Sequence, residues 1–538
     1  MLAAMITSSR RSFLKQAGLS TLGLWLPGSV GLAGSPRPTG LTRGTPDEQG
    51  VSAAGILDFL AAVEKEAFEL HSLMVLRHGK VVAEGWWEPY GPEFVHTMYS
   101  MSKSFTSTAV GFAVAEGKMS VEDKVVSFFP DDLPATVSEN LAAMRVRDLL
   151  TMSTGNEKEP TQVVVKSDNW ARTFLAQNFA HTPGTQFMYN SAATYMCSAI
   201  VQKVTGQNIL DYLTPRLFEP LGIAGMRWEN CPRGIATGGW GLSIQTEGLA
   251  KFGQLLLQKG MWQGKQLIPA AWIEEASRKH IQQPGGDKPD RPKAQNDWLQ
   301  GYGYQFWRCQ GTAFRGDGAF GQFTIVLPEQ DAVIVMTSEN KNMQGQLDLV
   351  WKHLLPAFGE TPPRPNVQGT GFSVVSPDHP ILELQQRLKH LKLPLPAGSK
   401  TSPQAKNARF KLAANELGLT EVGFEFSDDT CTLVAGTNRI VCGLSGWHRT
   451  EGAFPGTPPR LISGGAPKTT ATSKIAAHAT WTDEQTLQLT WRYYETPHRD
   501  TLTCRFEGDK LTVTFLNSIT AMNPKAKDSR AALQGTRM

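Results

Sequence analysis

This sequence lacks a large excess of positive or negative charge. In its 538 residues, 53 Lys and Arg stand against 49 Asp and Glu, a net charge of +4. Residues 1–33 hold Arg10, Arg11 and Lys15 and no acid, so the remainder carries 4 − 3 = +1. A nearly neutral chain has no broad basic field of the kind that nucleic-acid binders use. We therefore expect no nucleic-acid partner.

Cysteine is also scarce, and the spacing of the cysteines matches no metal-binding motif. Neither a CxxC pair nor a Cys/His metal pattern occurs among Cys197, Cys231, Cys309, Cys431, Cys442 and Cys504. The spacing therefore predicts no structural zinc, and we expect no metal or organic cofactor. Cys431 and Cys442 flank a turn and would face each other across a hairpin. Either a disulfide in an oxidising compartment or two buried free thiols is compatible with that pattern.

The N-terminal segment is too short of apolar residues to make a good membrane span. Its most apolar stretch, residues 16–32, contains Pro27 and several glycines, whereas a span needs about 20 apolar residues. Arg10-Arg11 followed by Phe-Leu-Lys resembles a twin-arginine export signal. We expect residues 1–33 to be cleaved after Ala33, giving a periplasmic or otherwise exported protein without an integral membrane span. The alternative is a plain membrane anchor.

The length predicts two folded domains, because one core rarely grows beyond roughly 250–300 residues. Hairpin-like strands near 73–83 and apolar strands near 323–336 bracket a mainly helical region, so residues 45–358 read as an α+β domain with one antiparallel sheet. The proline-rich stretch 359–380 reads as a linker. Residues 381–538 start with a short helix and continue as short β-type runs, which predicts a small antiparallel β-barrel-like accessory domain. These runs are 421–426, 430–435, 439–444, 475–481, 486–494, 501–506 and 510–516.

Ser100 and Lys103 form a Ser-x-x-Lys pattern at the start of a helix predicted over residues 100–116. This spacing puts both side chains on one helix face, one turn apart. A serine hydroxyl becomes nucleophilic beside a base, and a lysine amine can serve when burial lowers its pKa from about 10.4 towards neutrality. Alone the pattern is weak, since it also occurs at Ser12 and Lys15 inside the predicted signal.

Further motifs follow in an order that strengthens the pattern. They are Tyr99–Ser104 (YSMSKS), Val146–Gly155 (VRDLLTMSTG), Pro183–Ser191 (PGTQFMYNS), Gly238–Leu242 (GGWGL), Phe252–Leu257 (FGQLLL) and Gly318–Gln322 (GAFGQ). Together they resemble the serine β-lactamase and penicillin-binding-protein group, in its class C β-lactamase-like branch. That branch includes esterases, D-amino-acid peptidases and 6-aminohexanoate-dimer hydrolases. The resemblance covers roughly residues 45–358 and implies the β-lactamase/transpeptidase-like fold.

The resemblance also implies the catalytic roles. Ser100 would be the acylated nucleophile, Lys103 its base, and Tyr189 the relay that protonates the leaving group. The backbone N–H groups of Ser100 and Gln322 would form the oxyanion hole, worth about 3–4 kcal/mol per donor. Gly321 would have a backbone role that lets substrate lie against the strand.

Two departures from the β-lactamase pattern bear on the substrate. Ser191 stands where β-lactamases have an asparagine, and Ala319 and Phe320 stand at the lysine and threonine places of the third motif, at the start of a strand. Losing that lysine removes an anion anchor and leaves an apolar wall. These departures favour a small, less anionic amide or ester substrate.

Other classes of function stay open at this stage. A penicillin-binding-type sensor would acylate without turnover, a true β-lactamase would hydrolyse antibiotics, and a structural envelope protein would do neither. A complete Ser, Lys and Tyr set favours an enzyme. The barrel aromatics, such as Trp481 and Trp491, read as barrel core, and the polar segment 284–297 as a surface loop.

Overall fold

The computed structural model describes residues 40–359, 380–404, 406–462, 472–523 and 525–538. The predicted signal segment 1–33 and nearly all of the predicted linker 359–380 lie outside the described residues. Residues from Gly40 to Met538 belong to one compact unit.

A seven-stranded sheet forms the centre of the first domain. Its strands, in spatial order, are β1 (Thr42–Arg43), β3 (Lys80–Trp86), β2 (Leu70–Arg77), β12 (Ala332–Ser338), β11 (Gln322–Leu327), β10 (Phe314–Gly318) and β9 (Trp307–Arg308). Every pair is antiparallel except β1 with β3. Because β2 pairs with β12, the two ends of the domain share one sheet, as predicted.

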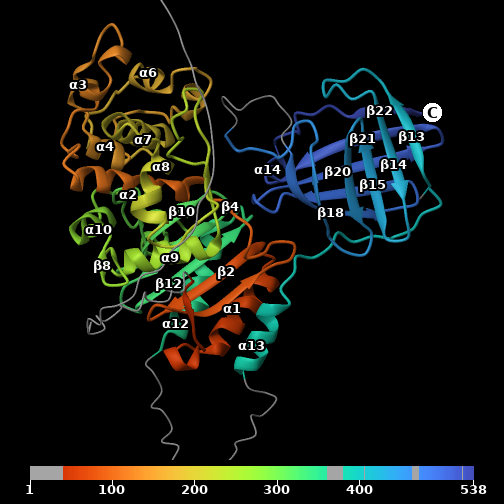
Figure 1. The fold of residues 1–538 in the computed structure, drawn as a ribbon, viewed down its shortest axis with the longest axis horizontal. Coiled ribbons are helices and arrows are strands. Elements are labelled where there is room, and N and C mark those ends of the chain that lie inside the picture. Colours follow the sequence, from red (N-terminus) through yellow and green to blue (C-terminus); the bar gives the residue numbers. More distant parts are fainter. Residues whose placement is uncertain (1–39, 360–379, 405, 463–471, 524) are drawn as a thin grey trace, which may run out of the picture. The chain divides into compact units, whose positions relative to one another are not determined.

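Helices cover both faces of this sheet because its strands alternate their side chains. In β12, Val333 and Val335 join a core with α2 (Ser102–Ala115) and α9 (Thr246–Leu257). Ile334 and Met336 point the other way, into a core with α1 (Ala53–Lys65). Figure 1 shows α1, α12 and α13 on one side of the sheet and α2 and α9 on the other.

The predicted helical region between the strands is present. Its further α-helices are α3 (Glu139–Ala143), α4 (Val146–Leu150), α5 (Thr161–Val164), α6 (Trp170–Leu175), α7 (Ser191–Thr205), α8 (Ile209–Leu213) and α10 (Ala270–Ser277). The last helical segment of the domain consists of α11 (Met343–Leu349), a π-helical turn (Val350–Leu354) and α12 (Leu355–Ala357). A separate short sheet has the strand order β4 (His96–Thr97), β6 (Leu242–Ile244) and β5 (Arg227–Trp228).

The second domain is an antiparallel barrel that follows helix α13 (Pro380–Lys389). Its strands, in spatial order, are β16 (Asn438–Gly443), β15 (Thr430–Ala435), β14 (Glu421–Phe426), β13 (Ala408–Leu412), β22 (Leu533–Arg537), β21 (Lys510–Asn517), β20 (Arg499–Glu507), β19 (Thr486–Arg492), β18 (Ser473–Trp481) and β17 (His448–Gly452). An additional pairing of Gly443 with His478 joins β16 to β18 and closes the barrel. The predicted fold class, α+β with a C-terminal barrel, is therefore confirmed.

The barrel core explains the aromatic and cysteine residues of this region. Trp481 and Trp491 are buried in it, as predicted. Cys431 and Cys442 face each other across β15 and β16, and both are buried free thiols.

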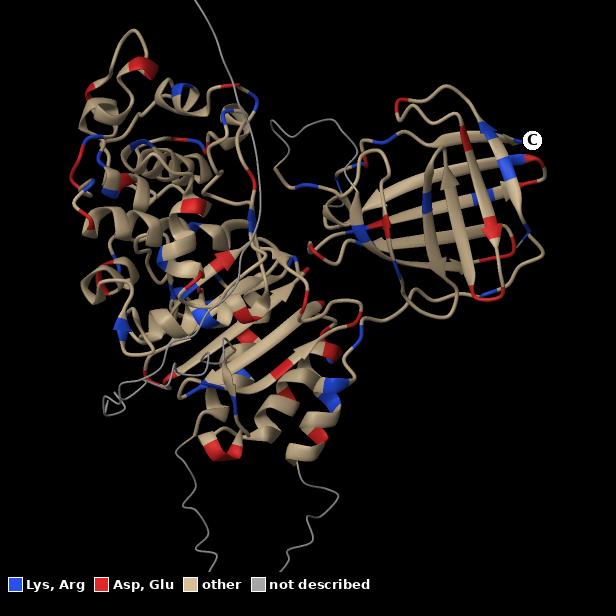
Figure 2. Ribbon diagram, viewed as in Figure 1, with Lys and Arg blue, Asp and Glu red and all other residues tan. Residues whose placement is uncertain are grey.

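Charge is distributed without a dominant sign along the described chain. Figure 2 shows Lys and Arg interspersed with Asp and Glu in both domains. Among the described residues, no helix is both long and apolar enough to cross a membrane.

Candidate active site

The candidate nucleophile Ser100 lies in a tight turn directly before α2. Residues Tyr99–Met101 form a 3₁₀ turn, and Tyr99 has a φ of +47°. The left-handed region is costly for a bulky residue, so the surrounding contacts must hold this turn in place. Ser102 Oγ does so by donating to the Tyr99 carbonyl (2.6 Å) and accepting from Leu242 N–H (3.1 Å). Ser100 itself is partly exposed.

Lys103 is buried next to this hydroxyl, with only 1% of its surface exposed. Its Nζ lies 3.0 Å from Ser100 Oγ, 3.0 Å from Ser191 Oγ and 2.6 Å from the Gly239 carbonyl oxygen. The carbonyl and the Ser191 hydroxyl can accept both N–H bonds of a neutral amine, which leaves the amine lone pair for the Ser100 proton.

The electrostatic surroundings of Lys103 favour that neutral amine. Burial lowers its pKa to about 7, although the carboxyl groups of Glu159 and Asp317 act in the opposite direction. An amine with this pKa can accept a proton near neutral pH.

Tyr189 completes the group of three. Its ring centroid is 4.9 Å from Lys103 Nζ. Burial raises the pKa of the Tyr189 phenol, an effect that the neighbouring Ser100 side chain only partly offsets. The phenol is therefore protonated at neutral pH and can donate a proton. The structure thus brings Ser100, Lys103 and Tyr189 together.

Ser191 reaches this site from the first position of α7. The preceding Asn190 is buried and caps the helix by accepting from Ala193 N–H (3.0 Å). Its side-chain amide also donates to Asn156 Oδ1 (3.1 Å). Asn190 is thus committed to the local fold, and the shorter Ser191 side chain supplies the polar contact to Lys103.

Ala319, Phe320 and Gly321 form the turn between β10 and β11, whereas the sequence suggested the start of a strand. Phe320 and Gly321 have φ values of +68° and +91°, and Gly321 N–H donates to the Gly318 carbonyl (3.1 Å). A Cβ on Gly321 would lie 2.1 Å from Gln346 Oε1, so glycine is required there for space as well as conformation.

Gln322 begins β11 directly after this turn. Its buried side chain donates to the carbonyl oxygens of Ala319 (2.9 Å) and Ser338 (2.7 Å). These two bonds hold the turn at residues 319–321 against strand β12. The oxyanion role of the Gln322 backbone N–H stays a prediction.

Strand β10 contributes residues that sequence reasoning missed. A Cβ on Gly316 would lie 2.2 Å from Met101 Sδ, and one on Gly318 would lie 2.1 Å from the Met98 carbonyl oxygen, so β10 packs directly against the nucleophile turn. Asp317, between these glycines, is buried, and Arg315 Nε donates to its carboxylate (2.9 Å). Burial raises the pKa of Asp317 to about 6 against the opposing effect of Arg315. The alternation of charged residues and glycines in residues 315–318 was the sequence pattern that could have pointed to this strand.

An aromatic cluster surrounds Tyr189. The Tyr189 ring stacks on Trp307 at 5.5 Å, and Tyr302 meets Trp307 edge-on at 5.0 Å. Phe187 and Trp298 pack against the same cluster. The surroundings of the phenol are therefore largely aromatic.

Comparison with known proteins identifies the family of this chain. Residues 61–354 match the beta-lactamase family. The 6-aminohexanoate-dimer hydrolase of Paenarthrobacter ureafaciens is 27% identical over 292 residues, which span 50% of this chain and 72% of that protein. The D-aminopeptidase of Brucella anthropi is 24% identical over 165 residues, covering 28% of this chain and 31% of the relative.

Two solved structures with a similar fold are a penicillin-binding-protein homologue and a carboxylesterase. A penicillin-binding-protein homologue from Pyrococcus abyssi has a TM-score of 0.45 at 15% identity, covering 89% of this chain and 99% of its own. A family VIII carboxylesterase has a TM-score of 0.42 at 16% identity, and the match covers 56% of this chain and 96% of the esterase chain. The resemblance predicted from the motifs is confirmed by the family match, which spans residues 61–354 and hence more than half of the 538 residues. The chain belongs to the beta-lactamase family.

Proposed function

We propose that this protein is a serine hydrolase that cleaves an amide or ester bond through an acyl-enzyme on Ser100. One observation carries the proposal: the buried amine of Lys103, with a pKa lowered to about 7 by burial, lies 3.0 Å from Ser100 Oγ. A hydrolase of this family needs a base at that position.

The proposed reaction has two halves. Ser100 Oγ attacks the substrate carbonyl carbon while Lys103 Nζ takes the hydroxyl proton, which gives a tetrahedral intermediate. Tyr189 then donates its proton to the leaving amine or alcohol and recovers one from the Lys103 ammonium. In the second half, water attacks the Ser100 ester, loses a proton to the same groups, and releases the acid and the free hydroxyl.

The negative oxygen of the intermediate needs donors. We assign this role to the backbone N–H groups of Ser100 and Gln322, whose surroundings are fixed by the short turns described above. Each donor of an oxyanion hole is worth about 3–4 kcal/mol of transition-state stabilisation.

The pocket residues support a substrate that lacks a carboxylate next to the scissile bond. Ser191, Ala319 and Phe320 supply no cation, and Arg315 is buried and paired with Asp317. The aromatic cluster around Tyr189 offers an apolar surface to the chain of an amide or ester. Relatives named as a 6-aminohexanoate-dimer hydrolase and a D-aminopeptidase act on related bonds.

The site of action is a separate proposal. We propose export by the twin-arginine route, supported by Arg10-Arg11 and the Phe-Leu-Lys that follows. Replacing both arginines with lysine should leave the chain uncleaved in the cytoplasmic fraction. Unchanged cleavage and release of that variant would contradict this route.

Intact-mass spectrometry with a fluorophosphonate tests the nucleophile. We expect one adduct on the wild type and none on Ser100→Ala. Ser107→Ala is the matched control, because the hydroxyl of this buried serine of the same helix has no hydrogen-bond partner in the described part of the chain. That control should label like the wild type.

The same proteins then separate the alternatives. Turnover of p-nitrophenyl esters and linear amides supports the hydrolase. A stable adduct without turnover would favour the acylating sensor. Efficient cleavage of nitrocefin would favour the β-lactamase. No adduct on folded wild type would overturn the proposed mechanism.

A further inference from the structure

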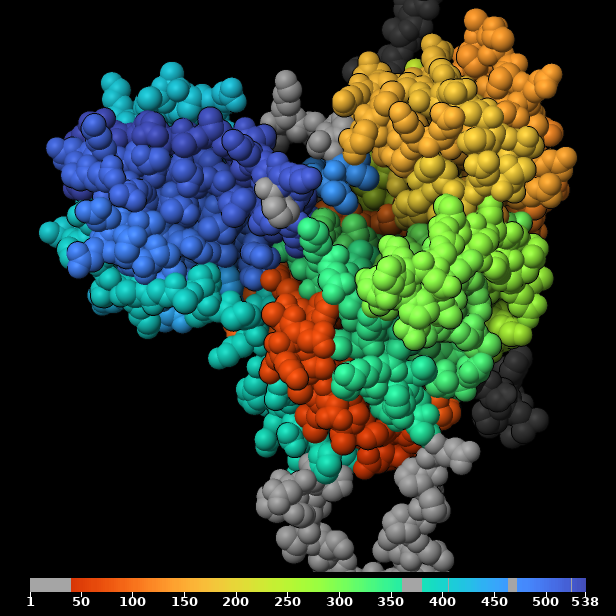
Figure 3. Space-filling model, turned by 180° about the vertical axis from the view of Figure 1, so that it is seen from behind, coloured from red at the N-terminus to blue at the C-terminus, as the bar shows by residue number. Residues whose placement is uncertain are grey.

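One turn of the barrel reaches the segment that carries the candidate nucleophile. It joins β19 to β20 and comprises residues 493–498. Thr97 donates from its N–H (3.0 Å) and its hydroxyl (3.3 Å) to the Glu495 carbonyl, and Tyr90 donates from its hydroxyl to the Thr496 carbonyl (3.2 Å). Figure 3 shows barrel atoms, in blue, against red and green atoms of the sheet domain.

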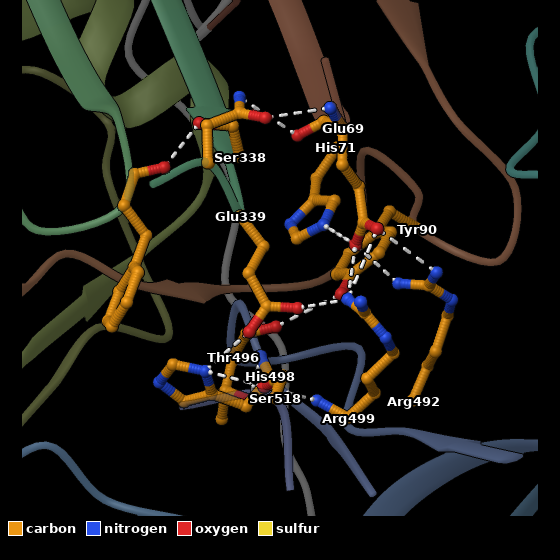
Figure 4. A network of polar contacts seen from close by, with 12 residues as sticks. Glu69, His71, Tyr90, Ser338, Glu339, Arg492, Thr496, His498, Arg499 and Ser518 are labelled. Carbon is orange, nitrogen blue, oxygen red and sulfur yellow. Dashed lines mark hydrogen bonds and ion pairs between the residues drawn. The ribbon is translucent and has the colours of Figure 1, made fainter. Parts of the chain in front are cut away.

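His498, at the end of this turn, is bonded on both ring nitrogens. Its Nδ1 lies 2.7 Å from Glu339 Oε1, and its Nε2 is bonded to the hydroxyl of Tyr99. An ionised carboxylate only accepts, so a neutral ring carries its proton on Nδ1 and accepts the Tyr99 hydroxyl proton on Nε2. Figure 4 shows Glu339 and His498 facing each other at the centre of this network.

Two arginines of the barrel hold the turn against the sheet domain. Arg499 bonds both Glu339 (2.5 Å) and Glu69 (3.2 Å), and Arg492 bonds Glu69 (2.5 Å). Glu339 is fully buried in this network, and Arg492 is nearly so. Buried and paired charges of this kind keep a fixed geometry, because separating them leaves unpaired charge out of water. The imidazole of His498 therefore has a defined position.

Tyr99 links that imidazole to the chemistry. It is the residue before Ser100, it has a φ of +47°, and its buried ring meets Phe320 edge-on at 5.5 Å. His498 also meets the Phe320 ring, at 5.0 Å. One barrel side chain thus contacts both the nucleophile turn and the turn that leads to Gln322.

The same barrel turn forms part of the wall of a cavity of about 300 Å³. Thr97, Tyr99, Thr496 and His498 line it together with Trp240, the neighbour of Gly239. The barrel therefore shares the wall of this cavity with Tyr99 and Trp240, the sequence neighbours of Ser100 and Gly239.

We propose that His498 is a positioning residue for the hydrolase reaction: it holds the Tyr99 hydroxyl and thereby keeps the turn at positive φ, with Ser100 presented to Lys103. This inference rests on the proposed function of Ser100. It makes the barrel a working part of the active site, although His498 does not touch the reacting atoms.

Three variants of the full chain test it. His498→Ala removes the contact, and His498→Gln keeps one donor and one acceptor. His478→Ala is the matched control, because it is an equally buried histidine of the same barrel whose ring meets Trp447 instead of the nucleophile turn. The readouts are the second-order rate constant for fluorophosphonate labelling of Ser100, and kcat and KM for p-nitrophenyl acetate.

We expect His498→Ala to lower the labelling rate constant and kcat by roughly 10- to 100-fold, with KM within about threefold of wild type, because misplaced nucleophiles and lost supporting contacts cost this much. His498→Gln should restore the labelling rate constant and kcat by at least half of the difference between His498→Ala and wild type, on a logarithmic scale. His478→Ala should stay within about twofold of wild type. Equal labelling rates for wild type and His498→Ala would overturn the inference, as would equal losses in His498→Ala and His478→Ala.

Tyr99→Phe provides a second, independent test, because it keeps the ring packing and removes only the hydroxyl. We expect it to lower labelling like His498→Ala, and the double variant to show no further loss. If His498→Ala does not fold, normal labelling of Tyr99→Phe would still refute the inference. Absence of labelling in wild type would instead refute the proposed function.

Discussion

Lys103 combines almost complete burial with three polar neighbours, and this combination has a measurable consequence for pH dependence. Because burial lowers its pKa from 10.5 to about 7, the amine is protonated below that pH and cannot accept the Ser100 proton. We expect kcat/KM for an ester to rise about tenfold per pH unit below 7 and to level off above it. A flat profile between pH 5 and 9 would contradict a lysine base.

Tyr189 has a role that depends on the leaving group. An alkylamine must be protonated to leave, whereas p-nitrophenolate leaves readily as an anion. We therefore expect Tyr189→Phe to lower kcat by at least 100-fold for a linear amide and much less for a p-nitrophenyl ester. Tyr195→Phe, which changes a buried phenol of α7 bonded to Cys231, is the control and should affect both substrates equally little. Equal losses of Tyr189→Phe on both substrates would argue against proton donation.

The sequence allowed Ser100, Lys103 and Tyr189 to be selected because each stands in a motif of fixed spacing. Asp317 and His498 carried no such signal. Asp317 lies among glycines, and His498 comes from another domain, 399 residues from its partner Tyr99. A residue such as His498, which acts through a contact between domains, leaves no local pattern in the sequence.

At the scale of elements, β10 shows why a strand can be missed. Its sequence, Phe-Arg-Gly-Asp-Gly, lacks the continuous apolar run by which β2, β11 and β12 were predicted. The two charges pair with each other, and the two glycines admit the nucleophile turn. Three barrel strands, β13, β17 and β22, were also missed, because each is five residues long and has at most two buried positions.

The close packing of β10 predicts the effect of a single methyl group. In Gly318→Ala the new Cβ would lie 2.1 Å from the Met98 carbonyl oxygen, so the strand or the nucleophile turn must move. We expect at least a tenfold lower labelling rate of Ser100, together with a lower melting temperature. Gly286→Ala, where a Cβ meets nothing within 4 Å, should change neither. Wild-type labelling of Gly318→Ala would show that the turn tolerates the displacement.

At the scale of the whole molecule, a few partly buried ion pairs link the two domains. Burial raises the pKa of Glu69, but Arg492, His71 and Arg499 more than reverse this effect and hold it well below its usual value. The stabilisation from Glu69 is therefore fully present near neutral pH and is lost as pH falls through that depressed pKa. The junction should persist under mildly acidic conditions.

Removing Glu69 tests this dependence. In Glu69→Ala, Arg492 and Arg499 lose their shared carboxylate, and we expect a loss of about 3–5 kcal/mol in the free energy of unfolding, measured with urea at pH 7. Arg439→Ala breaks an exposed pair with Glu425 in the barrel and should cause no measurable change. Equal midpoints for the two variants would show that the buried pairs do not stabilise the fold.

The contact between Tyr99 and His498 also has a consequence for the order in which the protein is made. The two residues are separated by 399 positions, so Ser100 leaves the ribosome long before the histidine has been translated. Until the barrel is finished and docked, the strained turn has no partner on its tyrosine. If His498 positions Ser100 as proposed, Ser100 of a growing chain should react with a fluorophosphonate roughly 10- to 100-fold more slowly until the barrel turn at residues 493–498 has been added and has docked.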